Sequence, residues 1–181
     1  MNKILSFVVI LALGCISGHK DVSAQDVKAE ASVKKTDFSD QSTWVLGYFV
    51  RGQITRAPHS EWFTKGYDEY IIDAQVLEKV KTIPQEGLTI RVILGTWCPD
   101  SRKQVPRFMK IIDAWQFPEQ SLTFIGVDDA KLSPVGEYEK LDIQRVPTFI
   151  FYKNNIEAGR IIENPVTSLE QDMVKILTGK E

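Results

Sequence analysis

Two stretches of the chain determine its fold: GTWCPDS at residues 95–101 and RVPTFIFYKN at residues 145–154. The apolar run 88–94 precedes the first stretch and predicts a buried strand. Residues 98–114 then carry helical apolar spacing, with Phe108, Ile111 and Ile112 as core candidates. The second stretch leads into a strand predicted from Pro147 to Tyr152. Cys98 is therefore expected at the start of a helix, directly after a buried strand.

The elements around these stretches alternate between helix and strand. A helix is predicted from Asp68 to about residue 81, a strand at 122–127, a short helix from Ser133 to about Leu141 and a strand at 158–163. A capping box at residues 167–170 predicts a last helix that ends near residue 177. Alternation requires crossovers and a parallel pair of strands, whereas the tight turn at 153–155 makes the last two strands antiparallel. The sequence thus predicts an α/β protein whose mixed central sheet has helices on both faces.

This order and these motifs resemble the thioredoxin superfamily over residues 68–177. The redox motif of that family ends a strand and opens a helix, as WCPDS does here, and Pro106 lies eight residues after Cys98, where the family has its helix-kinking proline. The segment 145–154 is similar to the family's cis-proline segment. Arg102, Gln104 and Pro106 also resemble a run found in exported thioredoxin-like reductases of bacteria. The resemblance implies the thioredoxin fold, with a cis peptide bond before Pro147.

The chain departs from the family pattern at three positions. Ser101 replaces the second cysteine of Cys-x-x-Cys, which removes intramolecular disulfide chemistry. Val92 stands where thioredoxin has a buried acid, which removes a proton acceptor. Asn155 replaces the turn glycine, a local change because asparagine tolerates positive φ.

Cys98 and Ser101 are the candidate catalytic residues. Unpaired amide groups and the helix dipole at a helix start favour a thiolate, and the Ser101 hydroxyl one turn later is expected to point at the sulfur. Asp100 opposes the anion, and Arg102 and Lys103 offset that effect. Without a second cysteine, the mixed disulfide must be resolved by an external thiol or by the client's own thiolate, or it holds the client covalently.

Five further residues are candidates for substrate binding: Trp97, Pro99, Asp100, Val146 and Pro147. A cis-proline leaves the backbone of Val146 beside the thiol, where an extended peptide can pair as an added strand. Two functions follow. The first is a monothiol thiol–disulfide oxidoreductase or isomerase for exported proteins. The alternative is a redox-inactive module that binds an extended peptide or client in the cis-proline cleft.

Residues 1–24 are typical of an export signal. A positive start at Lys3 precedes the apolar run 4–13, and the sequence Val-Ser-Ala at 22–24 resembles a signal-peptidase site. Residues 12–15 form an imperfect lipobox, in which Cys15 would be lipidated. Either exit leaves Cys98 as the single free thiol. We therefore expect a periplasmic or secreted protein, with a membrane as partner only if Cys15 carries a lipid.

Residues 25–42 are polar and predict a flexible leader, and residues 43–181 predict the thioredoxin-like domain with an N-terminal extension. A strand is expected at 44–50 and a loop at 51–59, then a short helical turn capped by Ser60 and interrupted by Gly66. Residues 43–65 either cover the site or extend the edge of the sheet.

Composition excludes several other functions. The chain carries a net charge of −2 and residues 1–24 carry +1, so the remainder carries −3. The sequence has no basic run interleaved with aromatic residues, so nucleic acid is not expected as a partner. The sequence contains no cluster of zinc ligands and no phosphate-binding loop, so we expect neither a metal nor a cofactor. It also lacks the residues that copper delivery or peroxidase chemistry requires. The expected partners are exported protein substrates or a thiol donor.

Overall fold

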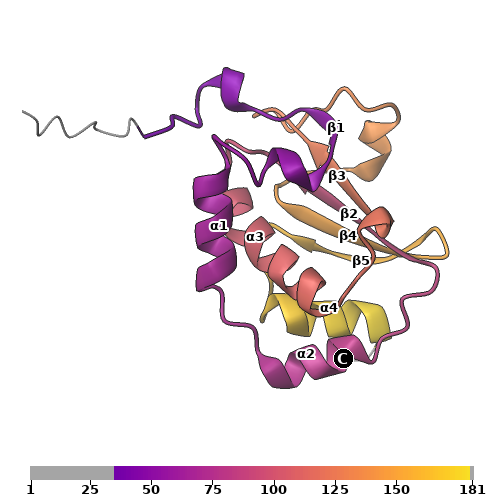
Figure 1. Cartoon of the computed structure of the whole chain (residues 1–181). Helices are drawn as coiled ribbons and strands as arrows, with labels where there is room; N and C mark the ends of the chain where they lie inside the picture. Colours follow the sequence, from indigo (N-terminus) through magenta and orange to yellow (C-terminus); the bar gives the residue numbers. More distant parts are fainter. Residues whose placement is uncertain (1–34, 180–181) are drawn as a thin grey trace, which may run out of the picture. The chain divides into compact units, whose positions relative to one another are not determined.

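The computed structural model describes residues 35–179 (Figure 1). The predicted export signal, the lipobox with Cys15 and the first part of the predicted leader lie outside the described residues. Within residues 35–179, no helix is both long enough and apolar enough to span a bilayer.

A five-stranded mixed sheet forms the centre of the domain, in the order β1-β3-β2-β4-β5 (Figure 1). The strands are β1 (Gly47–Phe49), β2 (Leu88–Leu94), β3 (Leu122–Gly126), β4 (Thr148–Lys153) and β5 (Ile156–Ile162). The central strand β2 runs parallel to β3 and antiparallel to β4. Strand β5 pairs antiparallel with β4, and β1 pairs antiparallel with β3. The predicted mixed central sheet is confirmed, with the C-terminal end of β2 leading directly to the WCPDS motif.

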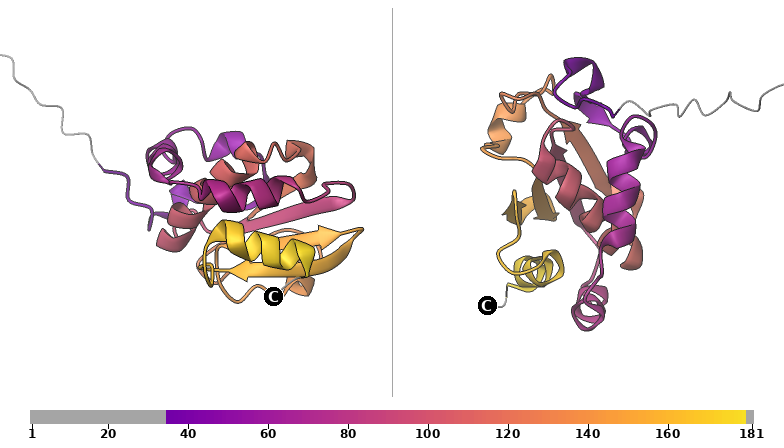
Figure 2. Two further views of the ribbon diagram at one scale, coloured as in Figure 1. Left: turned by 90° about the horizontal axis from the view of Figure 1, so that it is seen from below. Right: turned by 90° about the vertical axis from the view of Figure 1, so that its left-hand side faces the viewer.

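One face of the sheet packs against four α-helices. They are α1 (Ser60–Glu69), α2 (Ala74–Lys81), α3 (Pro99–Ala114) and α4 (Leu169–Thr178). Alternate strand residues such as Val92 and Phe149 join Phe108 of α3 in one buried cluster, because side chains along a strand alternate between faces. Figure 2 shows these helices gathered on one side of the strands. This cluster is the main core, and it fixes α3 and therefore Cys98.

The other face has a thinner cover. Ile93, Ile125 and Ile150 point to it and pack against the segment that holds η4 (Tyr138–Leu141), a 3₁₀ helix. The sequence predicts a short helix from Ser133, but regular structure begins only at Tyr138. The Ser133 hydroxyl donates to the carbonyl of Gly126 instead of capping a helix. Helical elements thus pack on both faces of the sheet: the four α-helices on one face and the 3₁₀ helix η4 on the other.

The single helix predicted from Asp68 is wrong, because two helices share this region. The α1 helix ends at Glu69, residues 70–73 have no helical structure, and α2 begins after Asp73, whose carboxylate accepts from the first amides of α2. Glu170 of α4 holds the break: it accepts from the Tyr70 hydroxyl at 2.8 Å and from the Asp73 amide at 3.3 Å. Ile71, predicted on the core face, is 89 % exposed.

Gly66 does not interrupt α1 as predicted but lies inside this ten-residue helix. A Cβ at Gly66 would lie 2.5 Å from Cγ of Pro106 on α3, so glycine allows the two helices to approach closely. The residue that precedes α1 as its N-cap is His59, not Ser60, and its side chain makes no capping hydrogen bond.

Residues 43–65 do both things that the sequence left open, and residues 35–42 pack on the same domain. Strand β1 extends the sheet edge beyond β3, and residues 43–45 contact the loop that precedes Cys98. Three 3₁₀ turns lie outside η4's segment: η1 (Gln41–Thr43), η2 (Arg51–Gln53) and η3 (Glu119–Ser121). Arg51 of η2 forms a bidentate ion pair with Asp113 of α3, at 2.7 and 2.6 Å, and the Tyr67 hydroxyl donates to the same carboxylate. The part of the predicted leader that is described therefore packs on the domain.

The C-terminal elements follow the prediction more closely. Asn154 and Asn155 take φ values of 51° and 65° in the β4–β5 turn, the positive φ expected at this site. The cap of α4 differs in detail: Ser168 accepts from the Gln171 amide, whereas Glu170 turns away toward α2 and completes no capping box.

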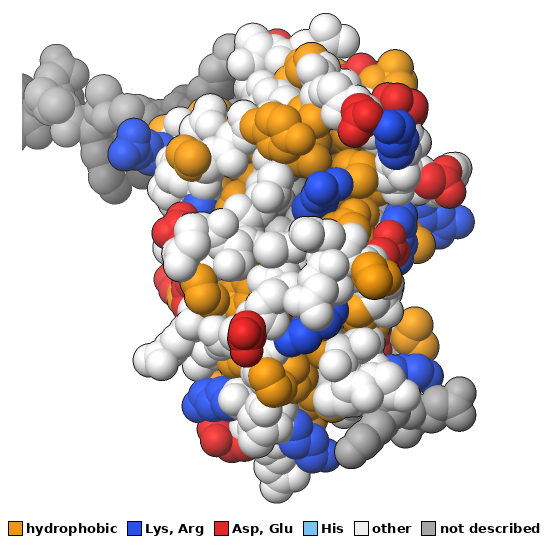
Figure 3. Space-filling model, turned by 90° about the vertical axis from the view of Figure 1, so that its right-hand side faces the viewer, with side chains coloured by type: hydrophobic (Ala, Val, Ile, Leu, Met, Phe, Trp, Pro, Cys, Tyr) orange, Lys and Arg blue, Asp and Glu red, His pale blue; other side chains and the backbone are white. Residues whose placement is uncertain are grey.

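Three exposed hydrophobic side chains lie on or beside the edge strand β1. Leu46, Tyr48 and Val50 are 48 %, 66 % and 68 % exposed. Figure 3 shows the side of the molecule opposite α1, where hydrophobic side chains gather in the upper part and basic and acidic side chains are interspersed.

Candidate active site

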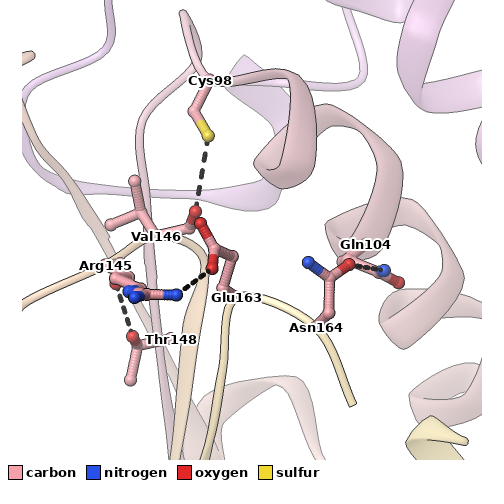
Figure 4. Close-up of polar contacts among 7 residues, drawn as sticks. All are labelled: Cys98, Gln104, Arg145, Val146, Thr148, Glu163 and Asn164. Carbon is pink, nitrogen blue, oxygen red and sulfur yellow. Dashed lines mark hydrogen bonds and ion pairs between the residues drawn. The ribbon is translucent and has the colours of Figure 1, made fainter. Parts of the chain in front are cut away.

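Cys98 caps the N-terminus of α3. Its backbone is extended (φ −76°, ψ 124°), and Pro99 follows at the first helical position, which suits a helix start. The thiol donates to the carbonyl oxygen of Val146 at 3.4 Å, across from the loop that precedes β4 (Figure 4). The residue is only 7 % exposed. The structure therefore brings together the two motifs that lie 48 residues apart in the sequence.

The loop before Cys98 is held by the indole of Trp97. Its Nε1 donates to the Val127 carbonyl at 3.0 Å. A Cβ on Gly95 would lie 2.5 Å from that same Nε1, so glycine is needed for the ring to fold back over the loop. The ring of Trp44 packs 6.2 Å from that of Trp97. Trp97 thus joins the site to the N-terminal segment.

Ser101 is completely buried on α3, one turn after Cys98. Its hydroxyl oxygen accepts from the Gly95 amide at 3.3 Å, whereas the sequence predicted a hydroxyl that points at the sulfur. Val92, which stands in place of the family's acid, is also fully buried and lies in the main core. Ser101 therefore fixes the loop that carries the thiol.

The segment before β4 forms the second wall of the site. The Val146–Pro147 peptide bond is cis. Val146 is 3 % exposed, and its carbonyl is occupied by the thiol rather than left open as the sequence hypothesis supposed. The Pro147 carbonyl accepts from the Glu163 amide at 2.7 Å, which joins this wall to the end of β5.

Two polar pairs beside this wall were not singled out by the sequence. The Arg145 guanidinium pairs with the Glu163 carboxylate at 2.8 Å, and the Gln104 amide donates to Asn164 Oδ1 at 2.7 Å (Figure 4). Gln104 is 4 % exposed and belongs to α3, so the second pair joins the thiol-bearing helix to the end of β5. No local pattern indicates either pair, because the partners are 18 and 60 residues apart.

The N-terminal side of the site contains a stack of aromatic and basic groups. The Phe38 ring lies 5.7 Å from His59 and 4.6 Å from the Arg102 guanidinium. Burial lowers the pKa of His59, and the charge of Arg102 lowers it further. Burial also lowers the pKa of Arg102, while the charge of Cys98 acts in the opposite direction. Arg102 is thus a cation that interacts electrostatically with Cys98.

Thr96 ties the same N-terminal segment to the site from the other side. The buried hydroxyl accepts from the Val45 amide at 3.2 Å and donates to the Thr43 carbonyl at 3.4 Å. A cleft of about 490 Å³ lies alongside, between residues 35–39 and the Trp97 ring. Of the other predicted binding residues, Pro99 is exposed and Asp100 is half-buried.

Metal ligands do not gather in this part of the chain. Among residues 35–179, no three histidine, cysteine or acidic side chains come close enough to hold an ion. The chemistry that this geometry allows is that of one sulfur at a helix N-terminus, beside a backbone acceptor.

Comparison with known proteins agrees with this arrangement. A family model described as thioredoxin matches residues 55–175, more than half of the 181 residues. The chain belongs to the thioredoxin family. A protein of Dictyostelium discoideum named "Putative thioredoxin-5" is 32 % identical over 114 residues, which cover 61 % of this chain and 99 % of that protein.

A solved structure supports the fold of this thioredoxin-family chain. It is a protein of unknown function from Pseudomonas aeruginosa, with a TM-score of 0.52 and 11 % identity, covering 70 % of this chain and 87 % of the other. The family match begins at residue 55, so β1 and the segment that packs on Trp97 lie before it. The thioredoxin fold is therefore shown.

Proposed function

We propose that this thioredoxin-family protein is an exported monothiol thiol–disulfide oxidoreductase or isomerase that acts through Cys98. The observation that carries the proposal is the position of Cys98: it is the N-cap residue of a 16-residue helix, and its thiol lies 3.4 Å from the Val146 carbonyl in the proline-bearing wall. A helix N-terminus supplies unpaired amides and a positive dipole end, which favour the thiolate form.

The proposed reaction is thiol–disulfide exchange. The Cys98 thiolate attacks one sulfur of a client disulfide, a bond forms between the two sulfurs, and the client's S–S bond breaks. The second client sulfur leaves as a thiolate. A small-molecule thiolate or that client thiolate then attacks the mixed disulfide, which releases Cys98. Because Ser101 carries no thiol, this second attack cannot come from the protein's own motif.

The surroundings of Cys98 divide into groups that favour and disfavour the anion. Burial lowers the pKa of Arg102 and the charge of Cys98 opposes this shift, so this cation would pair with a thiolate. Asp100, in the first turn of α3, acts against it. Trp97 and Pro99 border the thiol along the chain, and Val146 with Pro147 forms the wall along which an extended client would pair.

Export and partners belong to the same proposal. The signal-like residues 1–24 support transport to the periplasm or outside the cell, and use of the lipobox would anchor the protein through Cys15. Disulfide substrates persist in those compartments, so exported proteins are the proposed clients and a small thiol the proposed donor.

The test is adduct formation. The protein spanning residues 25–181 is mixed with a small aromatic disulfide at neutral pH, and intact mass and release of the aromatic thiol are followed. We expect one adduct on Cys98, and none in Cys98→Ala, whose fold is checked by circular dichroism. If the wild type gives no adduct, the exchange chemistry is excluded, and a module that only binds clients remains.

Turnover is tested separately with a scrambled disulfide protein and a small thiol. We expect the wild type to accelerate recovery of the native protein, and Cys98→Ala not to. A wild-type rate equal to that of the small thiol alone would contradict catalysis even if the adduct forms.

A further inference from the structure

A groove lined by cations runs between α1 and α3. Its volume is about 280 Å³, and its lining includes Pro99, the residue that follows Cys98 in the sequence. Four basic side chains and one acidic side chain line it: Lys65, Arg102, Lys103, Arg107 and Glu69. The groove is thus strongly positive, although the chain as a whole is negative.

These cations are not neutralised by the domain itself. Within residues 35–179, none of the four takes part in an ion pair, whereas Arg51, Arg145 and Arg160 all do. Arg102 and Arg107 face aromatic rings of Phe38 and Tyr70 instead. On the opposite side of the molecule, basic and acidic side chains alternate (Figure 3). An unneutralised cluster of one sign is typical of a surface that attracts a partner of the other sign.

The shape of the groove follows from the helix packing. Gly66 and Pro106 bring α1 and α3 close together, because a Cβ on Gly66 would lie 2.5 Å from Cγ of Pro106, and Gly66 itself lines the groove. Pro99, in the first turn of α3, lines the same groove, and the helix dipole is positive at that end. Glu69 is the acidic residue of the lining and weakens the attraction, and Asp100 adds a second negative charge in the first turn of α3.

We infer that this groove, which we call the α1–α3 groove, binds an acidic segment of the client polypeptide next to the cysteine that reacts with Cys98. The inference rests on the proposed function and adds its substrate class. Pro99, Lys103 and Arg107 are four residues apart along α3 and span roughly 12 Å, which an extended chain covers in about four residues. The favoured clients thus carry Asp or Glu within about five residues of the reacting cysteine.

The experiment compares three peptides that carry one cysteine as a mixed disulfide with a coloured aromatic thiol. The cysteine is flanked on both sides by Glu, by Gln or by Lys. Stopped-flow absorbance gives the rate constant with which Cys98 releases the dye. We expect the Glu peptide to react fastest and the Lys peptide slowest, and the Glu-to-Gln ratio to fall toward one in high salt.

Lys65→Gln and Arg107→Gln should each lower the Glu-to-Gln ratio by about two- to fivefold. The matched control is Lys79→Gln, an exposed cation of α2 without an ion pair among the described residues, which should leave the ratio unchanged. Equal rates for the Glu and Gln peptides at low salt, or an equal loss in the control, would overturn the inference.

Failure of the underlying chemistry has a different signature. If none of the three peptides reacts, the proposed exchange activity fails, and the groove is tested alone with a fluorescent, cysteine-free Glu peptide. Anisotropy should then show binding that Lys65→Gln and Arg107→Gln weaken by the same factors. No binding, or binding that these variants leave intact, would overturn the groove as the site for an acidic segment.

Discussion

Gly126→Ala is expected to detach the N-terminal segment from the site, although the substitution is the smallest that a glycine can undergo. A Cβ at this position would lie 1.9 Å from the Val45 carbonyl oxygen and 2.7 Å from its carbonyl carbon. No flexible side chain can yield there, because the atoms in the way are backbone. Residues 43–46 must therefore move by more than an ångström.

The magnitude follows from the contacts that such a movement breaks. The Val45 amide and the Thr43 carbonyl both hydrogen-bond to Thr96, and each such bond contributes about 0.5–1.5 kcal/mol. Overpacking that is only partly relieved costs about 1–3 kcal/mol. We expect the free energy of unfolding to fall by about 2–4 kcal/mol, since some of these losses replace one another.

Urea denaturation followed by tryptophan fluorescence measures this change, because Trp44 and Trp97 lie in the affected region. Alkylation of Cys98 should also become faster, since the loop that covers it loosens. Gly136→Ala is the matched control: nothing lies within 4 Å of its added Cβ, and its stability should stay within about 0.5 kcal/mol of the wild type. A loss below about 0.5 kcal/mol for Gly126→Ala would refute the idea that residues 43–49 are an integral part of the domain.

Three further outcomes are expected. Burial raises the pKa of Asp113, but hydrogen bonds from its partners outweigh this effect and lower the pKa below its ordinary value. The stability that the Asp113 carboxylate contributes is therefore present above about pH 4 and is lost as pH falls through the folded pKa. Asp113→Asn should thus lower the free energy of unfolding in urea by about 1 kcal/mol at pH 7 and by progressively less below pH 4. Ser101→Cys should raise the rate of insulin reduction in a turbidity assay, because a second thiol can resolve the mixed disulfide on Cys98 within the protein, and a wild type that already matches a dithiol thioredoxin would contradict this. Gly66→Ala should lower the melting temperature despite a gain of about 1 kcal/mol in helix propensity, because Pro106 is rigid and lies 2.5 Å away; a higher melting temperature would show that α1 can shift freely.

The sequence predicted those parts of the fold that depend on local pattern. Strand β2 was predicted with its observed bounds, and β3, β4 and α3 within one or two residues, since each is an uninterrupted apolar or amphipathic run. The errors arise where a distant residue decides. Glu170, about 100 residues away, accepts hydrogen bonds from the segment between α1 and α2, and Gly66 packs closely against Pro106, 40 residues away.

The same distinction applies to the site. Cys98 and Pro147 stand in recognisable motifs, and the structure places these motifs together. Glu163, Asn164 and the contacts of residues 35–45 carry no local signal, because their importance comes only from where the fold brings their partners.

In the proposed function, an extended client and the Cys98 sulfur compete for the Val146 carbonyl oxygen. The sulfur lies 3.4 Å from this oxygen, and exchange requires the thiolate form of a cysteine. A client that pairs as an added strand needs the Val146 carbonyl for its own amide, and would therefore take this acceptor from the sulfur. The sulfur would then lie free of this contact at the N-terminus of α3, where unpaired amides and the helix dipole favour an anion. In the proposed mechanism, the client's own backbone amide thus replaces the thiol at this oxygen when the client occupies the cleft.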